Sequence, residues 1–272
     1  MNRIKKLAFK HVFGKSEEAR HEYAVRESIK KKKYKAVIVT NSKGGVGKST
    51  VATAIALNLA DKSKIGILDA DISSANLPSI LHVPEDKKVE VTPDGTIIPL
   101  SVTPNLELYS IATLIDRDKV VSIPESGHDL FLRDASEIVK WQAKRLIIDL
   151  PGGTNMFLIA KKHFNVMGAV IVTMPNQIED TRRIIDLCRH NTVNILGLCE
   201  NFSGAVWENG EYVMRDNNYF APFGLNSMEK VCSEFGISYF GNIPLFQDFS
   251  MGRVRRWKTV SYLSEQIKTV LK

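Results

Sequence analysis

Lys43-Gly44-Gly45-Val46-Gly47-Lys48-Ser49-Thr50 joins the apolar segment Ala36–Thr40 to a helical pattern over Thr50–Asp61. A glycine-rich loop between a strand and a helix allows successive backbone N–H groups to face one anion, and the helix N-terminus adds a partial positive charge. The stretch therefore predicts a phosphate-binding loop, although Ser42 stands where the strict motif has its first glycine.

The residues of this loop have distinct expected tasks. Lys48 is expected to reach the β- and γ-phosphates of ATP or ADP, Ser49 to coordinate Mg²⁺, and Thr50 to lie on the α-phosphate side. The backbone N–H groups that would surround the phosphates belong to Gly44, Gly45, Val46 and Gly47.

Two further apolar segments end in aspartates. Ile65–Asp69 is followed by Asp71, and Leu146–Asp149 ends in Asp149 itself. Because parallel strands present their carboxyl ends at the ligand-binding edge of a sheet, we expect these carboxylates beside the phosphate loop. Asp71 is predicted to orient an attacking water and Asp149 to hold Mg²⁺ through water, and both are candidate metal contacts together with Ser49.

From Lys35 onward, β-rich apolar segments alternate with helical patterns, which indicates an α/β fold with a doubly wound, mostly parallel sheet covered by helices on both faces. One domain is expected over residues 36–272, after a basic arm over residues 1–35. Val89–Val91 and Ile97–Leu100, separated by turn residues, predict a surface hairpin. The predicted strands are Ala36–Thr40, Ile65–Asp69, Leu106–Ile111, Leu146–Asp149, Ala169–Thr173, Ile195–Glu200 and Tyr239–Asn242, and the predicted helices are Thr50–Asp61, Asp129–Trp141, Asp180–His190, Met228–Phe235 and Val254–Leu271.

Charge is distributed unevenly along the chain. Residues 1–35 hold 12 of the 37 Lys and Arg residues but only 4 of the 30 Asp and Glu residues, a net charge of +8, which leaves −1 for residues 36–272. A nearly neutral domain with a basic arm indicates that the arm contacts an anionic partner: a membrane surface, a nucleic acid or an acidic protein. The helical spacing of Ile4, Leu7 and Val12 fits a short amphipathic helix, a frayed tail or a helix docked on the domain.

Composition excludes several classes of protein. With 272 residues, 44% of them hydrophobic and 25% charged, the chain is neither collagen-like nor of low complexity. No apolar run approaches the ~20 residues of a membrane span, and the first residues lack the uninterrupted apolar stretch of a secretory signal. Three cysteines at irregular spacing fit a reducing compartment. We therefore expect a cytoplasmic protein whose arm allows peripheral attachment to a membrane.

Together these residues resemble the deviant Walker A ATPases, a group that includes MinD, ParA, the nitrogenase iron protein and the Mrp/ApbC family. Its specific mark is the doubled lysine, here Lys43 and Lys48 of Lys-Gly-Gly-Val-Gly-Lys-Ser. The resemblance implies that Lys43 crosses a dimer interface to contact the nucleotide of a second copy, so that ATP drives formation of a homodimer. It also implies that Asp71 is the switch I aspartate that acts in hydrolysis and that Asp149 is the switch II aspartate.

Within this group the chain is most similar to the Mrp/ApbC proteins, over residues 36–250. The resemblance implies that Asn201 recognises adenine and that Pro244 belongs to the wall on the purine side. The segments that carry it are Asp69–Ile72, Asp94–Pro99, Ile147–Pro151, Ala169–Pro175, Glu200–Ser203 and Phe240–Leu245.

Two departures from the family pattern bear on function. Members that carry an iron–sulfur cluster have a C-x-x-C after the position of Glu200–Ser203, because thiolates of both protomers hold a bridging cluster. Residues 204–224 contain no cysteine; they are rich in aromatic residues, which fits either a partner surface or the packing of a long loop. Gly152 replaces the family's second proline, so the resemblance does not define the rate or trigger of hydrolysis. The three cysteines lie in patterns typical of buried residues, which speaks against a bound cluster: Cys188, Cys199 and Cys232.

Three functions remain open on the sequence. The first is a slowly hydrolysing Mrp-like ATPase, a nucleotide-dependent dimer switch linked to iron–sulfur cluster assembly or metal delivery. Its ligands would come from an unidentified protein partner or from an unrecognised site on this chain. The second is a MinD- or ParA-like positioning ATPase whose dimer associates with a membrane or a nucleic acid and carries no cluster. The third is a scaffold that holds nucleotide without turnover, and the presence of both Asp71 and Asp149 argues against it.

Overall fold

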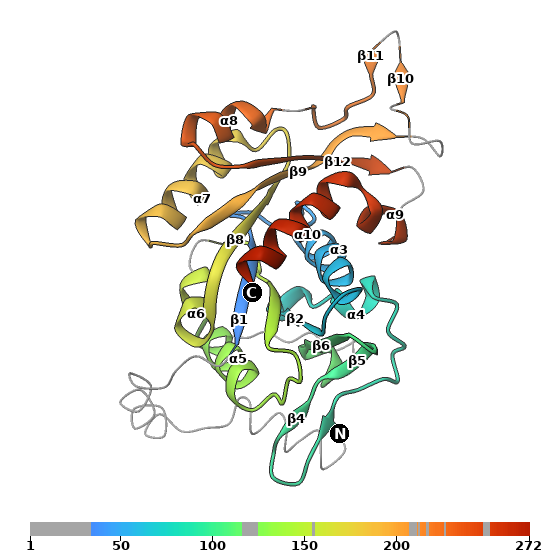
Figure 1. The fold of residues 1–272 in the computed structure, drawn as a ribbon, viewed down its shortest axis with the longest axis vertical. Coiled ribbons are helices and arrows are strands. Elements are labelled where there is room, and N and C mark those ends of the chain that lie inside the picture. Colours follow the sequence, from blue (N-terminus) through green and yellow to red (C-terminus); the bar gives the residue numbers. More distant parts are fainter. Residues whose placement is uncertain are drawn as a thin grey trace.

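A computed structural model describes residues 34–115, 125–153, 156–206, 211, 213–215, 218–225, 227–246 and 251–272. Its centre is one eight-stranded sheet, formed by β1 (Lys35–Thr40), β2 (Ile65–Asp69), β5 (Leu100–Thr103), β6 (Leu106–Ser110), β7 (Arg145–Asp149), β8 (Asn165–Thr173), β9 (Ile195–Val206) and β12 (Tyr239–Phe246). The order across the sheet is β12-β9-β8-β1-β7-β2-β6-β5 (Figure 1). Neighbouring strands are parallel except for β5, which runs antiparallel to β6.

Helices cover both faces of this sheet, so the predicted doubly wound α/β fold is confirmed (Figure 1). They are α3 (Lys48–Ala60), α4 (Leu77–Ile80), α5 (Glu125–Glu137), α6 (Met156–His163), α7 (Ile178–His190), α8 (Met228–Phe235), α9 (Met251–Arg256) and α10 (Lys258–Val270), with the short 3-10 helices η1 (Ile72–Ser74) and η2 (Ile111–Thr113). Val37 and Val39 of β1 belong to the core layer shared with α3, α9 and α10. Ala36 and Ile38 belong to the layer shared with α5 to α8. Because both faces of β1 are buried, the strand is a continuous apolar run.

The C-terminal helix expected over Val254–Leu271 is two helices, so that prediction is wrong at Trp257. The Trp257 backbone is extended between α9 and α10, with φ −64° and ψ 135°. Its indole N–H donates a hydrogen bond to the carbonyl of Asn242 in β12 at 2.7 Å. This contact breaks a helix that the apolar spacing alone would continue. The apolar side chains of that pattern are nevertheless largely buried, as expected of a core helix: Val254, Val260, Leu263 and Ile267.

α5 lies four residues earlier than predicted and ends at Glu137 instead of Trp141. Beyond its end, Val139 forms a parallel bridge with Ile97. Trp141 is buried, and its indole N–H donates to the carbonyl of Ala135 at 2.9 Å. Apolar residues that the local pattern assigns to the helix therefore make tertiary contacts beyond its end instead.

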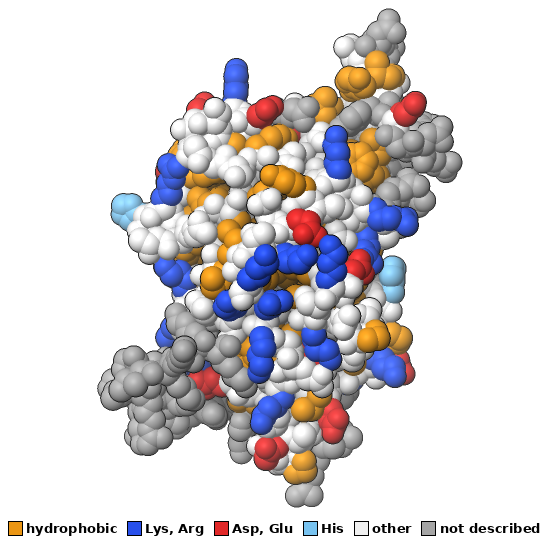
Figure 2. All heavy atoms as spheres, viewed as in Figure 1, with side chains coloured by type: hydrophobic (Ala, Val, Ile, Leu, Met, Phe, Trp, Pro, Cys, Tyr) orange, Lys and Arg blue, Asp and Glu red, His pale blue; other side chains and the backbone are white. Residues whose placement is uncertain are grey.

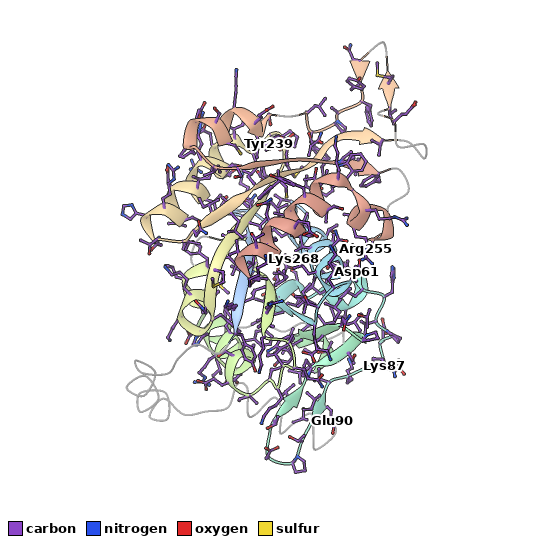
Figure 3. The ribbon with its side chains drawn as sticks, in the orientation of Figure 1. Asp61, Lys87, Glu90, Tyr239, Arg255 and Lys268 are labelled. Atoms are coloured by element: carbon purple, nitrogen blue, oxygen red, sulfur yellow. The ribbon has the colours of Figure 1, made fainter. Side chains whose placement is uncertain are left out.

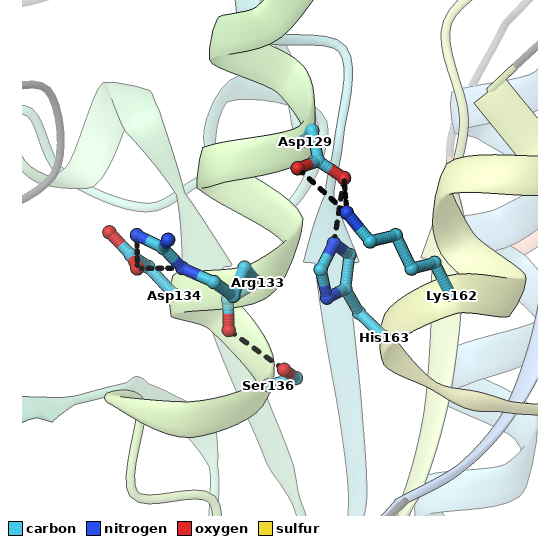
Figure 4. A network of polar contacts seen from close by, with 6 residues as sticks. All are labelled: Asp129, Arg133, Asp134, Ser136, Lys162 and His163. Carbon is cyan, nitrogen blue, oxygen red and sulfur yellow. Dashed lines mark hydrogen bonds and ion pairs between the residues drawn. The ribbon is translucent and has the colours of Figure 1, made fainter. Parts of the chain in front are cut away.

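α6 was not predicted, and its position depends on α5 (Figure 4). The Asp129 carboxylate of α5 accepts hydrogen bonds from His163 at 2.9 Å and from Lys162 at 3.2 Å. The His163 hydrogen bond, against the effect of burial, lowers the pKa of Asp129 to about 2. Within α5, the Arg133 guanidinium also pairs with Asp134. The Asp129 contacts therefore join α6 to α5, just after the segment that follows β7.

Two small hairpins lie outside the main sheet. β3 (Glu90–Val91) and β4 (Ile97–Ile98) pair antiparallel, which confirms the predicted surface hairpin. β10 (Met214–Arg215) and β11 (Asn218–Tyr219) form a second hairpin that projects from the body (Figure 1). Met214 and Tyr219 are more than half exposed. The basic arm falls almost wholly outside the described residues, which begin at the buried Tyr34.

Lys and Arg side chains gather over α10 and the adjoining end of α3 on the face seen in Figure 2. Ion pairs join the segment just after α3 to the two C-terminal helices: Glu265 of α10 accepts from Lys62 at 2.8 Å, and Arg255 of α9 pairs with Asp61, as labelled in Figure 3. Because such pairs are solvated, they contribute less to stability than the apolar contacts beneath them. Among the described helices, none is long and apolar enough to cross a membrane.

Gly66, in the centre of β2, provides a test of the packing. A Cβ added there would lie 2.7 Å from the Trp141 ring and would also meet Leu146. Because overpacking of a core costs about 1–3 kcal/mol, we expect Gly66→Ala to lower the free energy of unfolding by that amount, measured by urea denaturation. Gly252→Ala, where a Cβ meets only the end of Arg256 at 4.0 Å, is the control and should leave stability unchanged or slightly higher. Equal stability of the two variants would contradict the packing described for β2.

Candidate nucleotide-binding site

Three neighbouring strands end together at one edge of the sheet. β1, β7 and β2 are adjacent and parallel, and their register aligns Asp149 with Val39 on one side and with Asp69 on the other. Backbone hydrogen bonds continue past the strand ends: the Ala70 N–H donates to the Asp149 carbonyl at 2.9 Å, and the Leu150 N–H donates to the Val39 carbonyl at 3.1 Å. The segments that follow the three strands therefore lie together, as the sequence predicts.

The loop between β1 and α3 has the backbone of an anion cradle. Gly45 and Gly47 have φ values of 78° and 84°, a region that disfavours L side chains. A Cβ on Gly44 or Gly45 would have no other described atom within 4 Å, so this part of the loop borders open space. α3 begins at Lys48, directly after the loop, and its N-terminal N–H groups add partial positive charge.

Lys48 lies between this loop and two carboxylates. Its side chain is buried, and its ammonium donates a hydrogen bond to the carbonyl of Lys43 at 3.0 Å. Burial lowers the pKa of Lys48, whereas the nearby Asp149 and Asp71 raise it. The cation is thus held beside the open part of the loop, where phosphate oxygens would be expected.

Asp149 is a buried carboxylate whose oxygens both lack a well-formed hydrogen bond among the described residues. Burial raises its pKa to about 7, while the neighbouring Ser49 hydroxyl and the Lys48 ammonium lower it. An unpaired buried carboxylate is costly unless a cation compensates it. The site therefore contains acceptor oxygens that the protein alone does not satisfy.

The two aspartates after β2 have different environments. Asp69 is fully buried and accepts hydrogen bonds from the Ser110 hydroxyl at 2.9 Å and from the Leu77 N–H at 3.2 Å. Burial, followed by the charge of Asp149, raises the pKa of Asp69 well above its usual range. Asp71 is only partly buried and caps η1 through the Ser74 N–H at 3.2 Å. Asp69 is therefore a structural residue, and Asp71 is the one with access to solvent.

This donor set fits Mg²⁺. Asp149, Ser49 and Asp71 provide the hard oxygen ligands that this ion prefers, and the two Asp149 oxygens are buried without a well-formed hydrogen bond among the described residues. Mg²⁺ in nucleotide sites is held mainly by phosphates and water, with one or two protein ligands. It is therefore consistent that no cluster of three or more His, Cys, Asp or Glu residues suited to a metal is found in the described part of the chain.

Lys43 is not directed into this cluster. Its side chain is 56% exposed, and its ammonium lies 2.6 Å from the Asp180 carboxylate in the first turn of α7. Sequence reasoning missed Asp180, because an acidic residue at the start of a helix has a sufficient local role and no local pattern connects it to Lys43.

Asn201 comes to the loop from β9, and Pro244 lies on the neighbouring strand β12. The Asn201 amide is buried and donates to the carbonyl of Val46 at 2.9 Å. Ile243, in register with Asn201, places Pro244 next to it on β12. The aromatic ring of Phe202, another residue that sequence reasoning missed, adjoins Gly47 and has a left-handed backbone with φ 57°. Asn201 and Phe202 therefore lie against the loop, and the adenine-side roles of Asn201 and Pro244 stay a prediction.

Gly152 explains one departure from the family pattern. A Cβ at this position would lie 2.7 Å from both the Gly44 nitrogen and the Lys43 carbonyl carbon. The Gly153 N–H also donates to the Asn41 carbonyl at 3.3 Å. Only glycine allows the segment after β7 to pack this closely on the phosphate loop.

The three cysteines are buried and unpaired, as predicted. Burial raises the pKa of Cys188 to about 11 and that of Cys199 and Cys232 to about 12. Because cluster ligation requires thiolates, these side chains do not fit an iron–sulfur cluster.

Comparison with known proteins identifies the family of this chain. Residues 32–269 match the ParA family model, described as a NUBPL iron-transfer P-loop NTPase. The chain belongs to this family. The predicted resemblance to P-loop ATPases of the MinD, ParA and Mrp/ApbC type is thereby confirmed.

Two relatives of this ParA-family chain have names tied to iron–sulfur chemistry. One is the iron-sulfur cluster carrier protein of Methanocaldococcus jannaschii, 34% identical over 235 residues that cover 84% of this chain and 78% of the relative. The other is the cytosolic Fe-S cluster assembly factor NBP35 of Kluyveromyces lactis, 31% identical over 231 residues that cover 81% of this chain and 69% of the relative.

Solved structures share the fold at lower identity. A nucleotide-binding protein from Archaeoglobus fulgidus in complex with ADP aligns with a TM-score of 0.62 and 23% identity, covering 83% of this chain and 87% of the other. MinD from Pyrococcus horikoshii, complexed with Mg-ADP, aligns with a TM-score of 0.53 and 17% identity, covering 88% of this chain and 98% of the other.

The raised pKa of Asp149 predicts a pH-dependent stability. The ionised form is disfavoured in the folded state, where the pKa of Asp149 is about 7, so the nucleotide-free protein should lose stability as the pH rises from about 4 to above 7. The loss has an upper bound of roughly 4 kcal/mol. Asp149→Asn should lack this loss, so its gain in free energy of unfolding over wild type should be larger at pH 8 than at pH 5. Asp86→Asn, at an exposed position, is the control and should show no such difference between the two pH values. Urea denaturation at both pH values measures the difference, and an Asp149→Asn effect that is independent of pH would refute it.

Proposed function

We propose that this chain is a slow, Mg²⁺-dependent ATPase that pairs with a second copy when ATP is bound and acts in iron–sulfur cluster assembly in the cytosol. The observation that carries the proposal is the convergence of Lys48, Ser49, Asp71 and Asp149 at the open side of the glycine loop.

Binding of the phosphates depends on the loop and the start of α3. The N–H groups of Gly44 to Gly47 and of the first turn of α3 would donate to the phosphate oxygens. The Lys48 ammonium, now bonded to the Lys43 carbonyl, would turn to the β- and γ-phosphates. Thr50, half-buried in the first turn of α3, would lie on the α-phosphate side. Asn201 and Pro244 would enclose the base.

Hydrolysis depends on the carboxylates. Asp71, partly exposed at the end of the β2 segment, would orient water for attack on the γ-phosphate. Ser49 and Asp149 would hold Mg²⁺, which supplies charge neutralisation to the phosphates when bound. The Asp149 oxygens support this role, because they lack a well-formed hydrogen bond among the described residues and Mg²⁺ would coordinate them. A scaffold without turnover would not need both carboxylates.

Dimerisation would complete the site with Lys43. This lysine is exposed at the rim of the loop, while Lys48 beside it is buried, so the two lysines of the motif are suited to different tasks. Lys43 would contact the nucleotide of the second copy, and ATP would then stabilise the dimer by contacts from both chains.

The cargo would be bound with help from another protein. Relatives named as cluster carriers and assembly factors support a place in iron–sulfur assembly. The buried thiols of this chain do not provide a ligand set, so a protein partner would supply the cluster ligands. The basic arm, with a net charge of +8, supports a second candidate: a positioning ATPase whose arm attaches it to an anionic membrane, nucleic acid or acidic protein.

Substitution of Asp71 separates binding from turnover. We expect Asp71→Ala to change the ATP dissociation constant by less than about threefold and to lower kcat by at least about 100-fold, since it removes the group that positions water. Lys48→Ala is the contrasting variant and should weaken ATP binding by at least about tenfold. Calorimetric titration and phosphate release measure the two effects. An undiminished rate in Asp71→Ala would move the catalytic role to another residue.

Anaerobic reconstitution tests whether this chain alone provides the ligands of a cluster. We expect the purified chain, treated with iron and sulfide and then desalted, to stay colourless and to hold far less than one cluster per dimer while still binding ATP, because its thiols are buried. Iron and sulfide assays with the visible spectrum provide the measurement. A stoichiometric cluster on this chain alone would contradict a partner-supplied ligand set.

A further inference from the structure

Lys43 is held by its own chain in this structure. Its ammonium lies 2.6 Å from the Asp180 carboxylate, and Asp180 is only 16% exposed although its partner is 56% exposed. An ion pair of this length is a charge-assisted contact that fixes the direction of an otherwise flexible side chain. Lys43 therefore reaches toward α7 of the same molecule instead of outward.

Ser42, which replaces the first glycine of the strict phosphate-loop motif, and Gly152, which replaces the family's second proline, both lie at this corner of the loop. The Ser42 hydroxyl donates to the Asp180 carbonyl at 3.3 Å and to the Asn41 side chain at 3.1 Å, which ties the backbone next to Lys43 to the first turn of α7. On the other side, Gly152 packs directly on the backbone of Lys43 and Gly44. The corner is thus clamped between α7 and the segment after β7.

We propose that Asp180 is a positioning residue that holds Lys43 in the single chain, so that its release from Asp180 is a required step in ATP-dependent pairing of two copies. The inference rests on the proposed function, since it assumes that Lys43 acts on the nucleotide of the second copy. A residue of α7, outside both the phosphate loop and the aspartate segments, would thus influence how readily two copies pair.

The ion pair is suited to reversible release. Asp180 keeps a second cationic neighbour when Lys43 leaves, because the Arg183 guanidinium lies 3.5 Å from its other oxygen. Asp180 also lies in the first turn of α7, where the helix dipole stabilises a negative charge. Breaking the contact therefore leaves no buried unpaired charge, and the cost stays in the range of a partly exposed ion pair.

The strength of the Lys43–Asp180 ion pair determines the expected effect on the dimer dissociation constant. Partly exposed ion pairs change an equilibrium by between about 1.4-fold and 5-fold. A symmetric dimer releases one pair in each chain, so removing the carboxylate should tighten the dimer by the square of that factor, roughly 2- to 30-fold.

The test is sedimentation velocity of the full chain over a range of concentrations with Mg²⁺ and AMPPNP. Asp180→Asn should lower the dimer dissociation constant by roughly 2- to 30-fold, with an AMPPNP affinity equal to wild type when measured at concentrations where the chain is monomeric. Asp180→Glu, which restores a carboxylate, should return the dimer toward wild-type strength. An unchanged or weaker dimer in Asp180→Asn would overturn the inference.

Three controls separate this role from other effects of charge. Asp186→Asn makes the same charge change at an exposed position farther along α7 and should leave pairing unchanged. Arg183→Gln removes the competing cation and should not strengthen the dimer. In a Lys43→Ala background, Asp180→Asn should give no gain; a persistent gain would show that Asp180 acts on something other than Lys43 and would overturn the inference.

Pairing of the wild-type chain, measured in the same experiment, tests the proposed dimer switch separately from the role of Asp180. Pairing of wild type with AMPPNP supports the dimer switch whatever Asp180→Asn does. If only Asp180→Asn pairs, the inference is supported and the restraint is stronger than estimated. If neither chain pairs while both bind AMPPNP, the dimer switch itself fails and the inference fails with it.

Discussion

β7 hydrogen-bonds in parallel to β1 on one side and to β2 on the other, and every functional group of the site depends on this pairing. The register brings Asp149 level with the end of β1, from which the phosphate loop leaves, and level with Asp69, from which the Asp71 segment leaves. Because β7 is buried on both faces and flanked on both edges, its carboxyl end cannot shift without disturbing two neighbouring strands. The carboxylate is therefore delivered to Lys48 and Ser49 by the sheet and not by a flexible loop.

Burial of these carboxylates lowers the stability of the folded chain when no ligand is bound. Asp149 is buried with both oxygens lacking a good partner, and Asp69 beside it is also buried, so one lysine faces more carboxylates than it can neutralise. Glycines with positive φ in the loop add backbone constraint. The two apolar layers around the sheet offset these costs. A nucleotide and a cation that satisfy the carboxylates would stabilise the folded chain by mass action, which couples occupancy of the site to its order.

Under the proposed function, this edge of the sheet keeps the groups for nucleotide binding although the thiols are not available as cluster ligands. The phosphate loop, Lys48 and the aspartates are all in place, whereas the thiols lie inside the core and are poor candidates for ligation. The deviations in sequence cluster around Lys43: Ser42 bonds to α7, Gly152 packs on the loop backbone, and Asp180 binds the ammonium. Changes at this corner would alter when two chains pair without altering how each chain holds its phosphates.

Local sequence was sufficient for the parts of this protein that local physics controls. The glycine loop between β1 and α3, the aspartates at the ends of β2 and β7, the main parallel strands and the burial of the cysteines follow from periodicity, glycine spacing and strand ends, so the fold class and the core of the site could be predicted. Tertiary structure decided the rest. Trp257 breaks the last helix by bonding to Asn242, Val139 leaves α5 to pair with Ile97, and Gly152 is required by a backbone far away in the chain. The Lys43 and Asp180 contact belongs to the same class, because an ion pair between distant residues exists only after the sheet has brought their elements together, and no local pattern records it.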